Sequence, residues 1–312
     1  MRKDKALDQH REVVTALRRY NAALATALGE HPQRVEALDL DGTRENQLRG
    51  LADSLADKLG LGDRFRGLWP EEGAKSLQDT LPVDILNEFF RARHSAVGFT
   101  LDAVALGEVM LAIDKRMREI FATDLVNADR AGLEEEWTSL WVDFRLVSAK
   151  FWESVATASL RLCAAYDRTA QLLAFIFFNV RKFDRDTYSG VIGQLTTNYA
   201  QEEQLFREQH GWRQIRATMA EVEALHSRRN ALTHSSTLRA GVWHPSATAA
   251  PVASTALERM RSKAVQQRAP DEEMTRLVKH CDTLSVVQLA ALDLCHFGLG
   301  TLKLSPLLFP PR

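Results

Sequence analysis

The stretch LEEEWTSLWVDFRLVSAKFWESVATASLRL, residues 133–162, carries the clearest structural signal in the chain. Its large apolar residues follow one another by threes and fours, apart from one step of seven, which places them on one face of an α-helix. The residues on this face are Leu133, Trp137, Leu140, Phe144, Val147, Phe151, Val155 and Leu162. The stripe predicts one long amphipathic helix that buries its apolar face against other helices.

Similar spacing extends through most of the chain on both sides of this stretch. No proline occurs between Pro82 and Pro245, and long helices are permitted there because proline disrupts a helix interior. Further patterns predict helices at residues 7–28, at 100–121 with Thr100 as N-cap, and at 271–299 beginning at Asp271. No run of alternating residues predicts a strand. The sequence therefore predicts an all-α fold.

Three stretches rich in Gly, Pro, charged or small polar residues are expected to be connections: 29–45, 60–82 and 235–254. A division near residues 125–130 is also expected. It separates an N-terminal helical region, residues 1–128, with a regulatory or sensing role, from a helical bundle formed by residues 129–312.

Composition and charge are typical of a folded soluble protein. Of the 312 residues, 45% are hydrophobic and 26% are charged, and the formal net charge is −1. Because the chain has no global basic field, binding to nucleic acid would depend on a local cluster of basic residues.

The three cysteines, Cys163, Cys281 and Cys295, lack the spacing of a zinc site or a disulfide framework. Buried free thiols in a reducing compartment are expected. Two of them adjoin histidines, His280 and His296, but adjacent residues point to different sides of a helix, so core packing is favoured over metal binding.

No targeting or membrane-spanning segment is expected. The charged N-terminus, residues 1–10, lacks the apolar core of a signal peptide. The longest apolar run, residues 172–180, is shorter than the ~20 residues needed to span a bilayer. We therefore expect a cytoplasmic protein that does not associate with membranes.

The motif DLDGT, residues 39–43, matches the first motif of haloacid-dehalogenase-type phosphatases, in which Asp39 would be the nucleophile and Asp41 the general acid. That chemistry requires a buried strand before the first aspartate, and the preceding residues are too polar to form one. The stretch also resembles the start of a calcium loop, but no Glu stands at the twelfth position. A turn before a helix is the favoured interpretation, and the phosphatase is a remote alternative.

The segment GWRQIRATMAEVEALHSRRNALTH, residues 211–234, contains a second apolar stripe, formed by Trp212, Ile215, Met219, Val222 and Leu225. At ~100° per residue, Arg229 falls within this apolar sector and Arg228 falls well off it. A buried guanidinium needs an anionic or polar partner. The partner is either Asp167, in a buried salt bridge, or a substrate phosphate, which Arg can bind at two points.

His234 follows Arg229 by five residues. On one regular helix the two residues would be ~140° apart around the axis and ~7.5 Å apart along it, and could not meet one phosphate. Either the helix ends near Thr233, which brings His234 back, or a symmetric dimer completes the site with a second Arg and His.

RNALTH, residues 229–234, resembles the signature of the HEPN superfamily: an Arg, a polar residue, and a His after four to six intervening positions. YDRTAQLLAFIFFNV, residues 166–180, resembles the apolar second-helix region of some bacterial members. The resemblance covers about residues 130–300 and implies a HEPN-like helical bundle that cleaves RNA without a metal or other cofactor.

By this resemblance, His234 acts as the general acid/base for attack of the ribose 2′-hydroxyl, Arg229 stabilises charge on the phosphate, and Asn230 orients His234 or the phosphate. The products carry 2′,3′-cyclic phosphates. Substrate binding is expected from Arg228, Arg213, Arg216 and Arg239, with Arg181, Lys182 and Arg185 as a further basic cluster. His226 and Asp167 are accessory candidates.

Active members of the superfamily usually form dimers with a composite cleft, and many are toxins of toxin–antitoxin, abortive-infection or antiviral defence systems. The resemblance thus implies a homodimer, RNA as substrate, and an antitoxin or regulatory partner protein. The alternative is a catalytically inactive HEPN-like module that binds a nucleotide or a protein.

Overall fold

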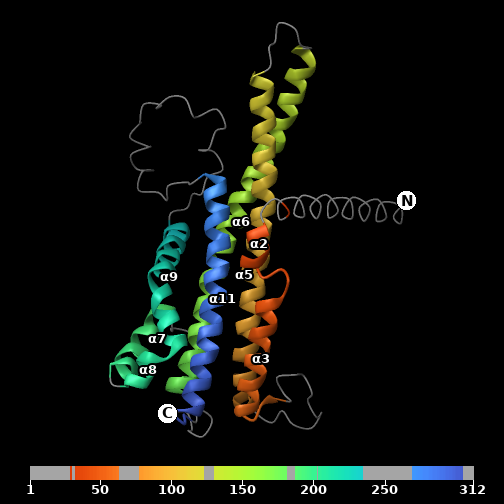
Figure 1. Ribbon diagram of the computed structural model, residues 1–312. Coiled ribbons are helices and arrows are strands. Elements are labelled where there is room, and N and C mark those ends of the chain that lie inside the picture. The colour runs from red at the N-terminus through yellow and green to blue at the C-terminus, as the bar shows by residue number, and fades with distance from the viewer. Residues whose placement is uncertain are drawn as a thin grey trace, which may run out of the picture. The chain divides into compact units, whose positions relative to one another are not determined.

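In the computed structural model, the described residues are residue 29 and residues 32–62, 77–122, 130–180, 187–201, 203–234 and 269–304. These segments contain eight α-helices and one π-helical turn, and no strand, which confirms the predicted all-α class for this part of the chain. In chain order they are α2 (Pro32–Ala37), α3 (Thr43–Lys58), α5 (Leu77–Ala122), α6 (Arg130–Phe178), α7 (Tyr188–Leu195), η1 (Thr196–Ala200), α8 (Gln204–Glu208), α9 (His210–His234) and α11 (Pro270–Gly300) (Figure 1).

Helix α6 contains the whole stretch whose apolar spacing predicts a long helix, and the prediction is confirmed. Four side chains on the predicted face are buried, those of Phe144, Phe151, Val155 and Leu162. Burying such a face is what stabilises a long helix, because helix propensity alone contributes little.

The start of α11 also agrees with the sequence prediction. The helix begins at Pro270, and Asp271, Glu272 and Glu273 occupy its first turn. Proline fits the first helical position because its missing N–H is not needed there, and carboxylates interact favourably with the positive end of the helix dipole.

The predicted N-cap at Thr100 is wrong. Helix α5 begins at Leu77 and continues through Thr100, whose side chain is buried. The residues before Thr100 carry the apolar spacing of a helix as well, and burial of Phe89, Phe90 and Ala96 outweighs the local preference of threonine for a cap.

Two of the expected connections are partly helical. The stretch 29–45 contains α2 and the start of α3, and the stretch 60–82 contains the start of α5. The helix expected at residues 7–28 and the connection expected at 235–254 lie outside the described residues.

The chain divides into two compact units, and both are discontinuous in sequence. Unit 1 consists of residues 1–36, 98–158 and 231–278, and unit 2 consists of residues 37–97, 159–230 and 279–312. The boundaries cut through α2, α5, α6, α9 and α11. The division expected between residues 128 and 129 stays a prediction.

In unit 1, α5, α6 and α11 pack closely around Gly107. A Cβ atom placed on this glycine would lie 2.3 Å from the sulfur of Met274 and 2.9 Å from the ring of Phe151. The absent side chain at Gly107 therefore lets the three helices approach one another.

In unit 2, a buried guanidinium joins three segments of the chain. Arg93 of α5 is 2% exposed, and its Nη2 atom donates to Asp39 Oδ2 over 2.7 Å. Its Nε atom donates to Glu45 of α3 over 3.2 Å, and its Nη1 atom donates to Ser285 of α11 over 2.8 Å and to Gln288 over 3.3 Å. Because its donors meet several acceptors, the buried charge is compensated within the core.

Asp39 has a structural role at the start of α3. Its two carboxylate oxygens accept hydrogen bonds from the backbone N–H groups of Arg44 and Glu45, both over 2.7 Å. The first N–H groups of a helix have no partner within the helix, so this carboxylate caps α3 while it also pairs with Arg93.

The rest of the motif at residues 39–43 forms the turn before the helix, as the favoured interpretation predicts. Gly42 has φ of 73°, a left-handed conformation that suits glycine, and its N–H donates to the carbonyl of Asp39 over 3.1 Å. Asp41 accepts from the backbone and the hydroxyl of Thr43, which lower the pKa of the Asp41 carboxyl. The described residues before this turn form α2, where the phosphatase alternative requires a strand.

Two helices in the described part are long and apolar enough to span a bilayer by length and composition, one within Val83–Ile120 of α5 and the other α11. Core helices of soluble proteins pass the same test. The segment of α5 contains Arg93 and Asp114, both buried, and Asp114 pairs with Arg118. The absence of a membrane association stays a prediction.

Candidate functional site

Helix α9 presents the apolar face predicted for it. Trp212, Ile215, Val222 and Leu225 are buried, and Met219 is half-buried. The two arginines that follow differ less than the helical spacing predicts, because Arg228 and Arg229 are both half-buried and both shield their Nε atoms from solvent. Their exposure does not distinguish the two arginines, and the expectation that Arg228 lies well off the packed face stays a prediction.

Asp167 of α6 lies opposite this part of α9. The Nε2 atom of His226 is 3.8 Å from Asp167 Oδ1, and the guanidinium of Arg229 interacts electrostatically with the same carboxylate. Arg229 and Asp167 thus interact electrostatically, while the buried salt bridge between them that one interpretation of the sequence predicts stays a prediction. Asp167 Oδ1 also accepts a hydrogen bond of 3.0 Å from the backbone N–H of Tyr188, the first residue of α7.

Asp167, His226 and Arg229 form a group that we call the Asp167 cluster, and burial shifts the pKa values of its carboxyl and imidazole groups. Burial raises the pKa of Asp167, although the Tyr188 N–H, His226 and Arg229 each favour the charged carboxylate. Burial also lowers the pKa of His226, and Asp167 opposes that shift. A neutral imidazole beside a carboxylate can accept a proton and have the resulting charge stabilised.

A second polar cluster lies where α9 packs against α11. Glu221 Oε1 accepts from the hydroxyl of Thr283 over 3.1 Å and lies 3.6 Å from Nδ1 of His280, and Glu221 Oε2 is 3.4 Å from Nζ of Lys279. Tyr166 of α6 donates to the backbone carbonyl of His280 over 3.1 Å. These contacts join three helices of unit 2, and sequence spacing alone did not indicate them.

The histidine and cysteine pairs of α11 pack as predicted. Cys281 and Cys295 are buried free thiols, as is Cys163. His280 is buried, and Nε2 of His296 lies 2.9 Å from the backbone carbonyl of Leu51 in α3. Within the described ranges, no group of three or more His, Cys, Asp or Glu side chains is arranged to hold a metal ion.

The remaining predicted site residues are placed only in part. Arg213 and Arg216 are exposed on α9. Asn230 and His234 belong to α9 by their backbone, while their side chains lie outside the described part, and His234 is the last residue of the helix. The two geometric alternatives for bringing Arg229 and His234 together both stay predictions. Arg239, Arg181, Lys182 and Arg185 lie outside the described residues.

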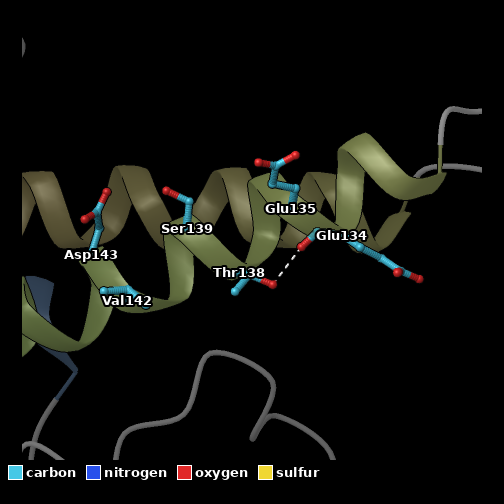
Figure 2. Close-up of a pocket in the computed structure, with 6 residues that line it drawn as sticks. All are labelled: Glu134, Glu135, Thr138, Ser139, Val142 and Asp143. Atoms are coloured by element: carbon cyan, nitrogen blue, oxygen red, sulfur yellow. Dashed lines mark hydrogen bonds between the residues drawn. The ribbon is translucent and has the colours of Figure 1, made fainter.

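Two surface depressions lie in unit 1, on α6 and on α5. Figure 2 shows one whose six lining side chains all come from α6: Glu134, Glu135, Thr138, Ser139, Val142 and Asp143. The hydroxyl of Thr138 donates to the carbonyl of Glu134 over 2.8 Å, which ties that side chain to its own helix. Three carboxylates make this face unfavourable for a polyanion such as RNA.

Comparisons of the chain with protein-family models, curated proteins and solved structures return no match. The functional interpretation therefore depends on the motif at residues 229–234 and on the chemistry of the side chains around it.

Proposed function

We propose that the protein is a HEPN-type endoribonuclease whose all-helical fold is a HEPN-like bundle. The observation that supports this most is the Arg-Asn-x-x-x-His motif at the C-terminal end of α9, with Arg229 half-buried in a cluster of titratable groups. A cation fixed in a partly buried position is suited to a phosphate whose charge increases in the transition state.

The proposed reaction needs neither metal nor cofactor. His234 acts as acid/base while the ribose 2′-oxygen attacks the adjacent phosphorus, Arg229 stabilises the charge on the phosphoryl oxygens, and Asn230 orients His234 or the phosphate. The bond from phosphorus to the 5′-oxygen breaks, and one product ends in a 2′,3′-cyclic phosphate. Arg213, Arg216, Arg228 and Arg239 bind the flanking RNA backbone.

The proposal includes a homodimer with a composite active site, because one regular helix separates the Arg and His of a single motif by ~140° around its axis. The protein acts in the cytoplasm as a toxin or anti-phage defence effector. The N-terminal region, residues 1–128, regulates it or senses its trigger, and an antitoxin or another regulatory partner restrains it.

The test is cleavage of total cellular RNA by the purified full-length chain in the presence of EDTA. We expect wild type to cleave, and Arg229→Ala and His234→Ala each to reduce the rate by a factor of about 10²–10⁴, because each removes one charge-stabilising or proton-transferring group.

Matched control variants show whether activity is lost because a catalytic group is missing, or merely because the protein has lost an arginine or a histidine. Arg145→Ala removes an exposed arginine from α6, and His210→Gln removes an exposed histidine from the start of α9. Both are expected to cleave like wild type. Equal activity of Arg229→Ala and wild type overturns the proposal, and so does cleavage that requires a divalent metal.

A second candidate function is a HEPN-like module that binds a nucleotide or a partner protein without cleaving RNA. It is favoured by the position of Asp167, whose carboxylate interacts with Arg229 and lies 3.8 Å from His226, so that it offsets positive charge in the cluster. Calorimetry distinguishes the two: a folded wild type that is inert toward RNA but binds a nucleotide, and loses binding in Arg229→Ala, supports the second.

A further inference from the structure

Helix α6 exposes apolar side chains on one face within unit 1. Among the described residues of this unit, the large apolar side chains that are exposed are those of Val142, which is 53% exposed, and Leu146, which is 64% exposed. They are four residues apart, so they lie on the same side of the helix. Exposed Ser139 and Ala149 extend this side in both directions. We call the four residues the outer face of α6.

The spacing of the outer face is that of a helix-pairing seam. Its positions follow one another by three, four and three residues, as in the apolar seam of a coiled coil. The opposite side of α6 packs inside the unit, where Phe144, Ser148 and Phe151 are buried. The outer face is therefore an apolar seam that the fold of unit 1 leaves exposed, and a second helix would bury it.

The charges along α6 determine which partner helix fits. Residues 134–143 contain four carboxylates and no basic residue, and Figure 2 shows Glu135 and Asp143 among them. Residues 144–152 contain no carboxylate and include the exposed Lys150. A second α6 in parallel orientation would place carboxylates against carboxylates, which is unfavourable. In an antiparallel pair, the acidic stretch of each helix lies against the stretch of the other that contains Lys150, so the charges are complementary.

We propose that the outer face of α6 binds the same face of a second copy of this chain, with the two helices antiparallel. A two-fold axis then passes near residue 144, so that Val142 of one copy faces Leu146 of the other, and Ser139 faces Ala149. Large side chains meet large ones, and small side chains meet small ones. The inference goes beyond the proposed function, because it names a surface through which two copies associate and does not depend on RNA cleavage.

Sedimentation equilibrium of the full-length chain tests the association. With rising concentration, wild type is expected to change from a mass of 35.1 kDa toward twice that mass. Leu146→Asp is expected to raise the dissociation constant at least about tenfold, because each dimer would bury two unpaired carboxylates at its centre. Leu205→Asp is the matched control: that leucine of α8, in unit 2, is 60% exposed, and the variant is expected to associate like wild type.

Disulfide cross-linking tests the antiparallel orientation. A Ser139→Cys chain mixed with an Ala149→Cys chain is expected to give a cross-linked dimer that contains one of each, since these positions face one another. The Ser139→Cys chain alone is expected to give none, because its two copies of residue 139 would lie ~15 Å apart along the helices. The native cysteines are buried and do not compete.

The outcomes separate this inference from the proposed function. A wild type that stays monomeric at every concentration overturns the inference, and so does a dimer that Leu146→Asp leaves unchanged. Cross-linking of Ser139→Cys with itself, or no cross-link in the mixture, contradicts the antiparallel pair. A protein that is inert toward RNA but dimerises through this face supports the inference while the proposed ribonuclease fails.

Discussion

At the scale of single residues, the molecule contains two partly or fully buried arginines in different environments. Arg93 meets two carboxylates, a hydroxyl and an amide in the core of unit 2. Arg229 is half-buried near one carboxylate and one imidazole. The first arrangement compensates the charge with several acceptors and is structural, whereas Arg229 is the residue that we propose to bind a phosphate.

Truncation of Arg93 tests its structural role. Arg93→Ala removes the cation that pairs with the buried carboxylate of Asp39. The free energy of unfolding is therefore expected to fall by about 3–5 kcal/mol. Urea denaturation of the full chain measures the change. Arg91→Ala is the control: that side chain is 76% exposed and pairs with Glu88 over 3.2 Å, so its loss is expected to cost at most about 1 kcal/mol. Equal losses in the two variants would contradict the structural account of Arg93.

Sequence reasoning identified some of these residues and missed others for physical reasons. Arg229 and Asp167 could be named because a cation in an apolar stripe demands a partner. Arg93 gave no such signal, since its partners come from segments far apart in the sequence. The turn at Asp39 is predictable from its local motif, but the contact of Asp39 with Arg93 depends on packing that no local motif encodes.

At the scale of elements, the apolar spacing of the sequence predicts the long helices but does not predict where they begin and end. The face of α6 was predictable from residue to residue. The start of α5 was not predictable in this way. Thr100 has the side chain of a typical N-cap, but it lies inside a helix that has buried residues both before and after it. Tertiary packing overrides the local signal in such cases.

Close packing of α9 against α11 gives a second stability prediction. A Cβ atom on Gly211 would lie 2.5 Å from the backbone oxygen of Ala290. Gly211→Ala is therefore expected to destabilise unit 2 by about 1–3 kcal/mol, because backbone must shift. Gly50→Ala, in α3 with nothing within 4 Å of its Cβ, is expected to raise stability by up to about 1 kcal/mol through helix propensity. Thermal unfolding of both variants checks the difference in sign, and a stabilised Gly211→Ala would refute this packing.

At the scale of the whole molecule, the two compact units interleave along the chain, and the boundary after Asn230 divides the HEPN-like motif between them. Arg229 and Asn230 belong to unit 2, and His234 belongs to unit 1. No sequence pattern indicates this division, because a compact unit need not be continuous in sequence.

The proposed composite site predicts complementation between inactive variants. Arg229→Ala and His234→Ala chains are each expected to be inactive, and co-expression is expected to restore part of the activity, because random pairing makes about half of the dimers mixed. Ribonuclease assays on the separated and co-expressed chains measure this. Mixed dimers that form but stay inactive would argue against a shared cleft.

The central claim concerns the chemistry of cleavage, and the ends of the RNA products test it most directly. Mass spectrometry of a synthetic RNA cleaved by wild type in EDTA is predicted to find a 2′,3′-cyclic phosphate on one product and a 5′-hydroxyl on the other, with no cleavage where the 2′-hydroxyl is replaced by hydrogen. Products with a 3′-hydroxyl and a 5′-phosphate, or cleavage of the 2′-deoxy site, would contradict attack by the 2′-hydroxyl.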